Sequence, residues 1–293
     1  MDGALVGDGY ASHLTDTDLR VLAAAAHAGP DASWLRGDPA ALAGLLGDPR
    51  VFEAVFGSPD DLAPGRARQP VPVSPFLTFA VAVHRSAAEL ASVDHVAERA
   101  GLRRRVPLFD APELRDFLGS PARRLFLAEL LASFTRVASG RYRVRSGGRT
   151  RTRRFSELDP VRLAGLLDGV PDADRPGVYR RLGDVSLFLA GVFPDYAAAY
   201  AFGPVGAAAL LRAAQVPAVA HERLAEAPAI ELLEYMGARW YKAACHLAPL
   251  RTARLDVVSE VADRFRQARR VLNHIADQYL LGAGHAWFAP PSP

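Results

Sequence analysis

Seven arginines and no acidic residue lie between Arg141 and Arg154, and this is the strongest chemical signal in the chain. The whole protein has a formal net charge of only +3, so the rest of the chain is net negative. Guanidinium groups crowded in this way attract anions. We therefore expect this segment to contact the phosphates of a nucleic acid or a nucleotide.

Gly147 and Gly148 divide the arginine segment into two runs in which arginine alternates with tyrosine, valine or threonine. Glycine tolerates the positive φ of a two-residue turn, so the pattern predicts a β-hairpin over 141–154. The expected opposed pairs are Ser146/Arg149, Arg145/Thr150, Val144/Arg151, Arg143/Thr152 and Tyr142/Arg153. Because strand side chains alternate, one face carries Arg141, Arg143, Arg145, Thr150, Thr152 and Arg154. The other face carries Tyr142, Val144, Ser146, Arg149, Arg151 and Arg153.

Other interpretations of the hairpin remain open. Its arginines could be solvated and paired with acids such as Glu129, Glu157 or Asp159. An acidic protein partner or an anionic lipid would also suit the charge. The preceding helix, 121–139, is largely apolar and offers few donors to base edges, so we expect backbone contact without strong sequence readout. About five phosphate contacts on duplex DNA would give a slope of log K against log salt of about −4 to −5.

Asp184 is a second candidate, because it lies in the most apolar predicted helix of the chain, 182–193. A buried carboxyl with a raised pKa suits general acid–base chemistry, in a pocket formed with the C-terminal helices. The alternative is a structural ion pair with Arg180, one helical turn earlier, or a hydrogen bond from a neighbouring group. We assign no catalytic residue from the sequence.

Metal-binding and nucleophile motifs give no further site. Folding the C-terminal helices on each other would place His274 near Glu226 and gather two histidines and two or three carboxylates at one end, namely His221, His274, Glu222, Glu226 and Asp277. Their spacing lacks the Glu-x-x-His pairs of carboxylate sites in helical bundles, so we expect no metal and no cofactor. Cys245 and His246 are neighbours on a helix and point about 100° apart, which predicts a packed cysteine. Phosphate-binding loops and the common hydrolase motifs are absent.

The composition indicates one large or two modest globular domains. The chain has 293 residues, of which 50% are hydrophobic and 23% charged. One cysteine excludes an internal disulfide framework. The longest apolar runs, 76–83 and 187–193, are too short for a membrane span, and no secretory signal is visible. We expect a soluble, cytoplasmic protein.

Helix start signals recur along the chain and predict a mostly α-helical fold. Ser74–Pro75, Ser120–Pro121 and Asp159–Pro160 each combine a capping residue with a proline at the first helical position, and Thr15 or Asp16 can cap an earlier helix. A proline-rich connection at 58–75 separates a small N-terminal helical section, 1–57, from a main helical domain, 76–293, that includes the hairpin.

The C-terminal third has the clearest helical periodicity. One apolar stripe steps alternately by three and four residues through Ile230, Leu233, Gly237, Trp240, Ala244 and Leu247. A second stripe does the same through Val258, Val261, Phe265, Ala268, Leu272, Ile275 and Tyr279. These stripes predict an antiparallel helical hairpin. The two apolar stripes could also mediate self-association into a homo-oligomer.

Two short segments carry a resemblance to a known family. The run from Tyr179 to Pro194 and the run from Tyr235 to Tyr241 resemble a family of uncharacterised helical proteins from high-GC bacteria. The resemblance implies a bacterial, intracellular and mostly helical protein. It brings no activity and no residue role.

Taken together, these patterns predict a helical bundle with one inserted arginine-rich β-hairpin and a C-terminal antiparallel helical hairpin. The leading hypothesis is a non-enzymatic binding or regulatory protein whose hairpin contacts phosphates. The alternatives are a helical enzyme or small-molecule binder with a pocket around Asp184 and Arg180, and a self-associating helical scaffold.

Overall fold

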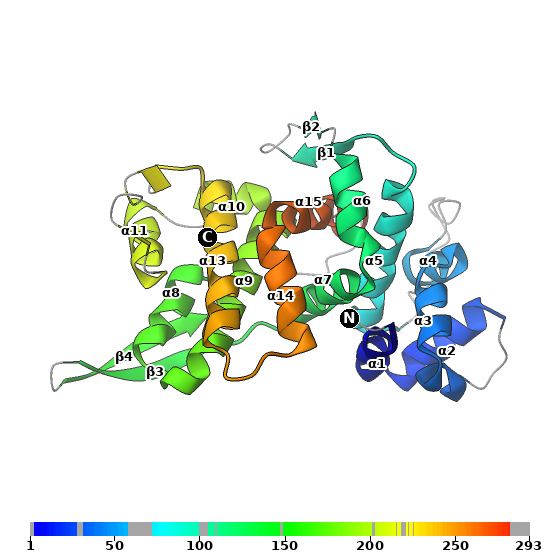
Figure 1. Cartoon of the computed structure of the whole chain (residues 1–293), viewed down its shortest axis with the longest axis horizontal. Coiled ribbons are helices and arrows are strands. Elements are labelled where there is room, and N and C mark those ends of the chain that lie inside the picture. The colour runs from blue at the N-terminus through cyan, green and yellow to red at the C-terminus, as the bar shows by residue number, and fades with distance from the viewer. Residues whose placement is uncertain are drawn as a thin grey trace, which may run out of the picture. The chain divides into compact units, whose positions relative to one another are not determined.

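A computed structural model of the chain confirms the mostly α-helical fold with one arginine-rich β-hairpin (Figure 1). It describes residues 3–27, 32–57, 72–99, 105–108, 110–146, 149–200, 203–214, 216–217, 221, 223–224 and 226–281. These residues form two compact units. The first contains the described residues within 1–96, 109–135 and 278–281, and the second those within 97–108 and 136–277.

The first unit is built from helices. They are α1 (Gly3–His13), α2 (Asp16–Ala25), η1 (Ser33–Gly37), α3 (Pro39–Leu46), α4 (Pro49–Phe56), α5 (Pro75–Leu90), α6 (Ala111–Gly119) and α7 (Pro121–Ser133). The predicted cap residues act as expected, since the side chains of Thr15, Ser74 and Ser120 each accept a hydrogen bond from the backbone three residues on. Helices on both sides of the predicted connection at 58–75 belong to this one unit.

Helix α5 forms the centre of the first unit. Its residues Phe76 to His84 are all buried, and it packs against α4, α6 and α7. The buried carboxylate of Asp18 ties α2 to the start of α5, because it accepts a hydrogen bond of 2.7 Å from the backbone N–H of Ser74. This bond satisfies an acceptor that would otherwise be costly to bury.

The second unit contains both two-stranded sheets and the remaining helices. Its strands are β1 (Val96–Arg99), whose first residue belongs to the first unit, β2 (Arg105–Leu108), β3 (Ser139–Ser146) and β4 (Arg149–Ser156). Its helices are α8 (Pro160–Ala164), η3 (Gly165–Asp168), η4 (Asp172–Asp174), α9 (Arg175–Val192), α10 (Pro194–Tyr200), α11 (Pro204–Ala213), α13 (Ala229–Leu247), α14 (Ala253–Asp263) and α15 (Phe265–Ile275). A π-helical turn, η5 (Ala276–Leu280), follows α15 and crosses into the first unit.

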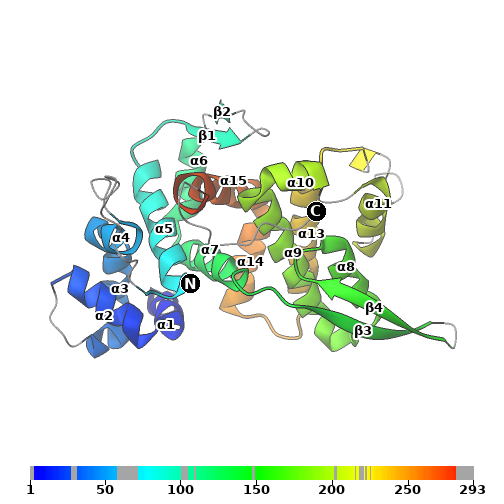
Figure 2. The same cartoon turned by 180° about the vertical axis from the view of Figure 1, so that it is seen from behind.

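Helix α9 is the core of the second unit. Every residue from Leu182 to Val192 is buried, and α13 and α15 pack along it (Figure 2). The predicted C-terminal hairpin is present as α13 and α14. The predicted second helix is not continuous, because the backbone leaves helical geometry at Arg264 (φ −118°, ψ 34°) and α15 turns to pack on α9.

The residues of both predicted C-terminal stripes are mostly buried inside this unit. Leu233, Trp240, Val258, Phe265 and Leu272 each keep at most 4% of their surface exposed. The stripes therefore form intramolecular core, and self-association through these helices would need other residues.

A charged network also joins distant segments of the second unit. Arg269 is 5% exposed at its side chain and pairs with Glu98 from β1 and with Glu234 from α13, at 2.5 Å from the latter. Arg266 and Arg270 extend the network, with ion pairs of 3.2 Å to Glu234 and 3.3 Å to Glu98. Removing one partner of such a buried pair leaves an uncompensated charge, so the network constrains how these segments pack.

Candidate phosphate-binding hairpin

Strands β3 and β4 form the antiparallel hairpin in the predicted register. Every predicted pair from Tyr142/Arg153 to Ser146/Arg149 is present, and pairing continues outward to Ser139 and Ser156. The predicted turn, Gly147–Gly148, lies outside the described residues, as do the side chains of Val144, Arg145, Ser146, Arg149 and Arg151. In both views the hairpin extends outward from the helices of its own unit (Figures 1 and 2).

One face of the hairpin packs inward at its base. Tyr142 and Phe155 lie edge to face, with ring centroids 6.5 Å apart. The hydroxyl of Tyr142 approaches Gly165 so closely that a Cβ there would lie 2.9 Å from it. The base of the hairpin therefore packs closely against the helical body at the junction of α8 and η3.

Arg153 also belongs to this inner face, and it is neutralised. Its guanidinium donates to Asp168 at 2.8 Å. This hydrogen bond, with a smaller contribution from Tyr142, raises the pKa of Arg153 above its usual value. Among the hairpin arginines whose side chains are described, Arg153 is therefore the one that already pairs with an acid of the fold.

The opposite face carries three arginines that no described residue neutralises. Arg141 and Arg154 are directly opposed across the strands, and Arg143 follows two residues after Arg141. All three are exposed and have no ion pair or hydrogen bond to the described part of the chain. Opposed residues on a strand pair have Cβ atoms about 5 Å apart, so these like charges repel one another unless an anion lies between them. We call Arg141, Arg143 and Arg154 the outer arginine cluster.

The acids that could have neutralised the cluster have other partners. Glu157 accepts a hydrogen bond from the Ala138 backbone at 3.0 Å and pairs with Arg181 of α9 at 3.0 Å. Asp159 caps α8 and pairs with Arg162 at 3.0 Å. Glu129 pairs with His13 inside the first unit at 2.8 Å. Among the described side chains, these three acids therefore do not neutralise the arginines of the hairpin.

Two neighbouring side chains donate hydrogen bonds to the Asp184 carboxylate, which indicates a role in the fold. Its Oδ1 accepts hydrogen bonds from Arg180 Nε at 2.9 Å and from the Tyr241 hydroxyl at 2.8 Å. Burial and the charge of Asp184 raise the pKa of Tyr241 well above its usual value, so the phenol stays protonated and donates. Neither Asp184 nor Arg180 lines any of three cavities that are formed by described residues and considered below.

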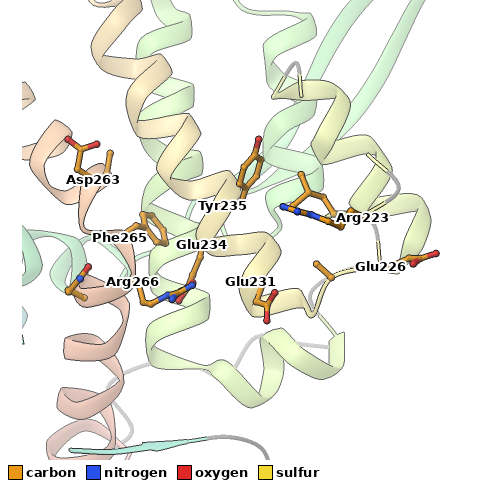
Figure 3. A pocket seen from close by; sticks show the side chains of 12 residues that line it. Arg223, Glu226, Glu231, Glu234, Tyr235, Asp263, Phe265 and Arg266 are labelled. Atoms are coloured by element: carbon orange, nitrogen blue, oxygen red, sulfur yellow. The ribbon is translucent and has the colours of Figure 1, made fainter. Parts of the chain in front are cut away.

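The largest of these cavities, about 740 Å³, lies between α13, the start of α15 and the segment before α13 (Figure 3). Its charged lining residues are four acids and two arginines, namely Glu226, Glu231, Glu234, Asp263, Arg223 and Arg266. This excess of carboxylates disfavours an anion. Among the described residues, no group of histidine, cysteine and acidic side chains is arranged to hold a metal.

Cys245 and His246 line a second cavity, of about 340 Å³. The Cys245 thiol donates to the Leu255 carbonyl at 3.4 Å, and burial raises its pKa. A raised pKa disfavours the thiolate that a nucleophile needs. The predicted packed cysteine therefore fits its surroundings.

No helix within the described ranges combines the length and the apolarity that crossing a membrane requires. Comparison of the chain with protein-family models, with curated proteins and with solved structures finds no match.

Proposed function

We propose that this chain is a non-enzymatic binding or regulatory protein whose β3–β4 hairpin grips the phosphates of a nucleic acid or a nucleotide. The observation that carries the proposal is the outer arginine cluster, which is exposed and unneutralised while the nearby acids are engaged elsewhere. Phosphate oxygens are the natural partners of such guanidinium groups. We also propose that the protein is located in the cytoplasm.

The composition of the outer face favours contact with the phosphate backbone over base readout. Its described members are arginine, threonine and serine, whereas the two aromatic side chains of the hairpin lie on the inner face. Stacking on aromatic rings supports the binding of single strands, and bidentate contacts to base edges support sequence specificity. We expect duplex binding with weak sequence preference and a strong dependence on salt.

The test is fluorescence anisotropy with labelled duplex DNA, duplex RNA and single-stranded DNA over a series of salt concentrations. The informative variant replaces Arg141, Arg143 and Arg154 with glutamine. Each phosphate contact on duplex DNA contributes about −0.9 to the slope of log K against log salt. We expect the triple variant to bind more weakly and its slope to be shallower by about 3.

A matched variant controls for the loss of three positive charges. Arg20, Arg50 and Arg251 are exposed, and the last two already pair with Asp48 and Asp256. Their replacement with glutamine should leave both affinity and slope nearly unchanged. Equal weakening by the two triple variants would mean that only net charge matters, and this would contradict the proposal. A nucleoside triphosphate is then added as a competitor of the labelled duplex. Displacement of the duplex indicates a nucleotide site, and its retention indicates a nucleic-acid site.

A further inference from the structure

A third cavity, of about 260 Å³, lies in the second unit between α9, α13 and the end of α11. It is lined by no residue of the arginine hairpin and by no residue that the sequence analysis assigned to a site. Its polar lining residues are Arg175, Tyr179, Arg239, Trp240 and His246, and its apolar ones are Ala214, Ala243 and Leu247.

Every polar side chain around this cavity can donate a hydrogen bond, and no carboxylate lines it. Two guanidiniums, a phenol, an indole N–H and an imidazole are together suited to an acceptor with negative charge. The 740 Å³ cavity of the same unit has the opposite character, with four carboxylates in its lining. The two cavities therefore differ in the charge of the ligand that each can accept.

Two donor nitrogens of these side chains are buried and have no hydrogen-bond partner in the described structure. Arg239 uses one terminal nitrogen to donate to the Ala214 carbonyl at 3.3 Å, but its Nε is buried and has no hydrogen-bond partner in the described structure. Trp240 is 1% exposed, and its Nε1 likewise has no partner there. A buried polar group without a partner is rare in folded proteins and costs stability.

The remaining cation at the cavity is held only at the surface. Arg175 pairs with Asp172 at 3.2 Å, and the side chains of the two residues are 44% and 89% exposed. Exposed ion pairs of this kind contribute little, so a bound anion could draw this guanidinium from Asp172 at small cost.

We propose that this cavity binds a small oxyanion, namely the carboxylate or the phosphate of a small molecule. The charged group lies against Arg239, with Arg175 and Tyr179 as further donors, and a short apolar part lies against Ala214, Ala243 and Leu247. A volume of about 260 Å³ is below the range of about 300–1,000 Å³ that holds drug-sized ligands, so the cavity is too small for a nucleotide. This ligand is distinct from the one proposed for the hairpin.

The experiment is isothermal titration calorimetry of the full chain with sodium benzoate and, separately, with sodium phosphate. Sodium chloride at the same ionic strength provides the blank. We expect at least one of the two probes to bind, and the one that binds distinguishes a carboxylate ligand from a phosphate. Absence of binding by both probes would overturn the proposal.

Three variants locate the binding. Arg239→Gln removes the charge and should weaken binding at least tenfold, and Tyr179→Phe should weaken it severalfold while removing a single oxygen. Arg50→Gln removes an equally charged, exposed arginine that belongs to neither proposed site, and this variant should bind the probe as the wild type does. If Arg239→Gln does not fold, Tyr179→Phe carries the test alone. Unchanged binding in the folded cavity variants, or an equal loss in Arg50→Gln, would overturn the assignment.

Discussion

Tyr241 donates a hydrogen bond of 2.8 Å to the carboxylate of Asp184, and the two residues join α13 to α9 in the core of the second unit. Arg180 donates to the same oxygen, and its guanidinium lies 5.7 Å from the centre of the Tyr241 ring. Both hydrogen bonds are accepted by the one carboxylate of α9, so we infer that Asp184 stabilises the fold.

Replacing Tyr241 with phenylalanine tests this role. The change removes one donor from a buried carboxylate without altering the ring, so we expect a loss of about 2 kcal/mol in the free energy of unfolding. Urea denaturation measures it. Tyr235→Phe, on the same helix and without a hydrogen bond among the described residues, should change stability by less than about 0.5 kcal/mol. Equal effects of the two substitutions would refute the structural role.

Two glycines of α9 offer a matched pair for the packing of α9 against α13. A Cβ on Gly183 would lie 2.3 Å from the Tyr241 ring, whereas a Cβ on Gly177 would meet nothing within 4 Å. We expect Gly183→Ala to destabilise the protein by about 1–3 kcal/mol through overpacking. Gly177→Ala should stabilise it by about 0.5–1 kcal/mol, because alanine favours the helix. Thermal denaturation of both variants would show opposite shifts, and shifts of the same sign would contradict this close packing.

The buried pair of Tyr10 and His84 in the first unit predicts a pH-dependent stability. Their side chains share a hydrogen bond of 3.0 Å, and burial, with a smaller effect of Arg124, lowers the pKa of His84 to about 3. The unfolded chain takes up this proton near pH 6.5 and the folded protein only near pH 3, so stability falls as the pH drops through this interval. We expect a loss of about 2 kcal/mol at pH 5 relative to pH 7.5.

His84→Gln provides the control for this titration. Glutamine can accept the Tyr10 hydrogen bond but carries no proton in this range, so the variant should lack the loss between pH 7.5 and pH 5. Urea denaturation at the two pH values gives the comparison. Parallel losses in the wild type and the variant would place the titration in other groups.

Asp168 provides a gain-of-binding prediction for the hairpin. Asp168→Asn removes the acid that occupies Arg153, so this arginine becomes available to phosphate. We expect tighter binding of duplex DNA and a salt slope that is steeper by about 0.9, the value of one contact. Asp172→Asn changes the net charge equally but releases Arg175, which is outside the hairpin. An identical gain from both variants would mean that long-range charge alone is responsible.

Local patterns predicted much of this fold from the sequence. The capping residues Thr15, Ser74 and Ser120 begin their helices as expected, and the alternation around Gly147–Gly148 predicted the hairpin register pair by pair. These signals succeed because capping and strand pairing in a short hairpin depend on neighbours along the chain.

Features set by distant contacts were not predictable. The engagement of Glu157 by Arg181, the break at Arg264 and the network around Arg269 all depend on segments that only the tertiary fold brings together. The cavity around Arg239 was also missed, because its donors come from separate helices and Trp240 gave only the signal of a core stripe. A pairwise pattern of charge along the sequence does not reveal which carboxylate a given arginine will meet.

The two hydrogen bonds of Glu157 restrict how the hairpin can move. The same carboxylate oxygen closes the base of the two strands at Ala138 and is anchored to Arg181 of α9. Rotation of the hairpin relative to α9 therefore requires these hydrogen bonds to break. A long polymer held by the outer arginine cluster would exert its torque directly on the central helix of the second unit.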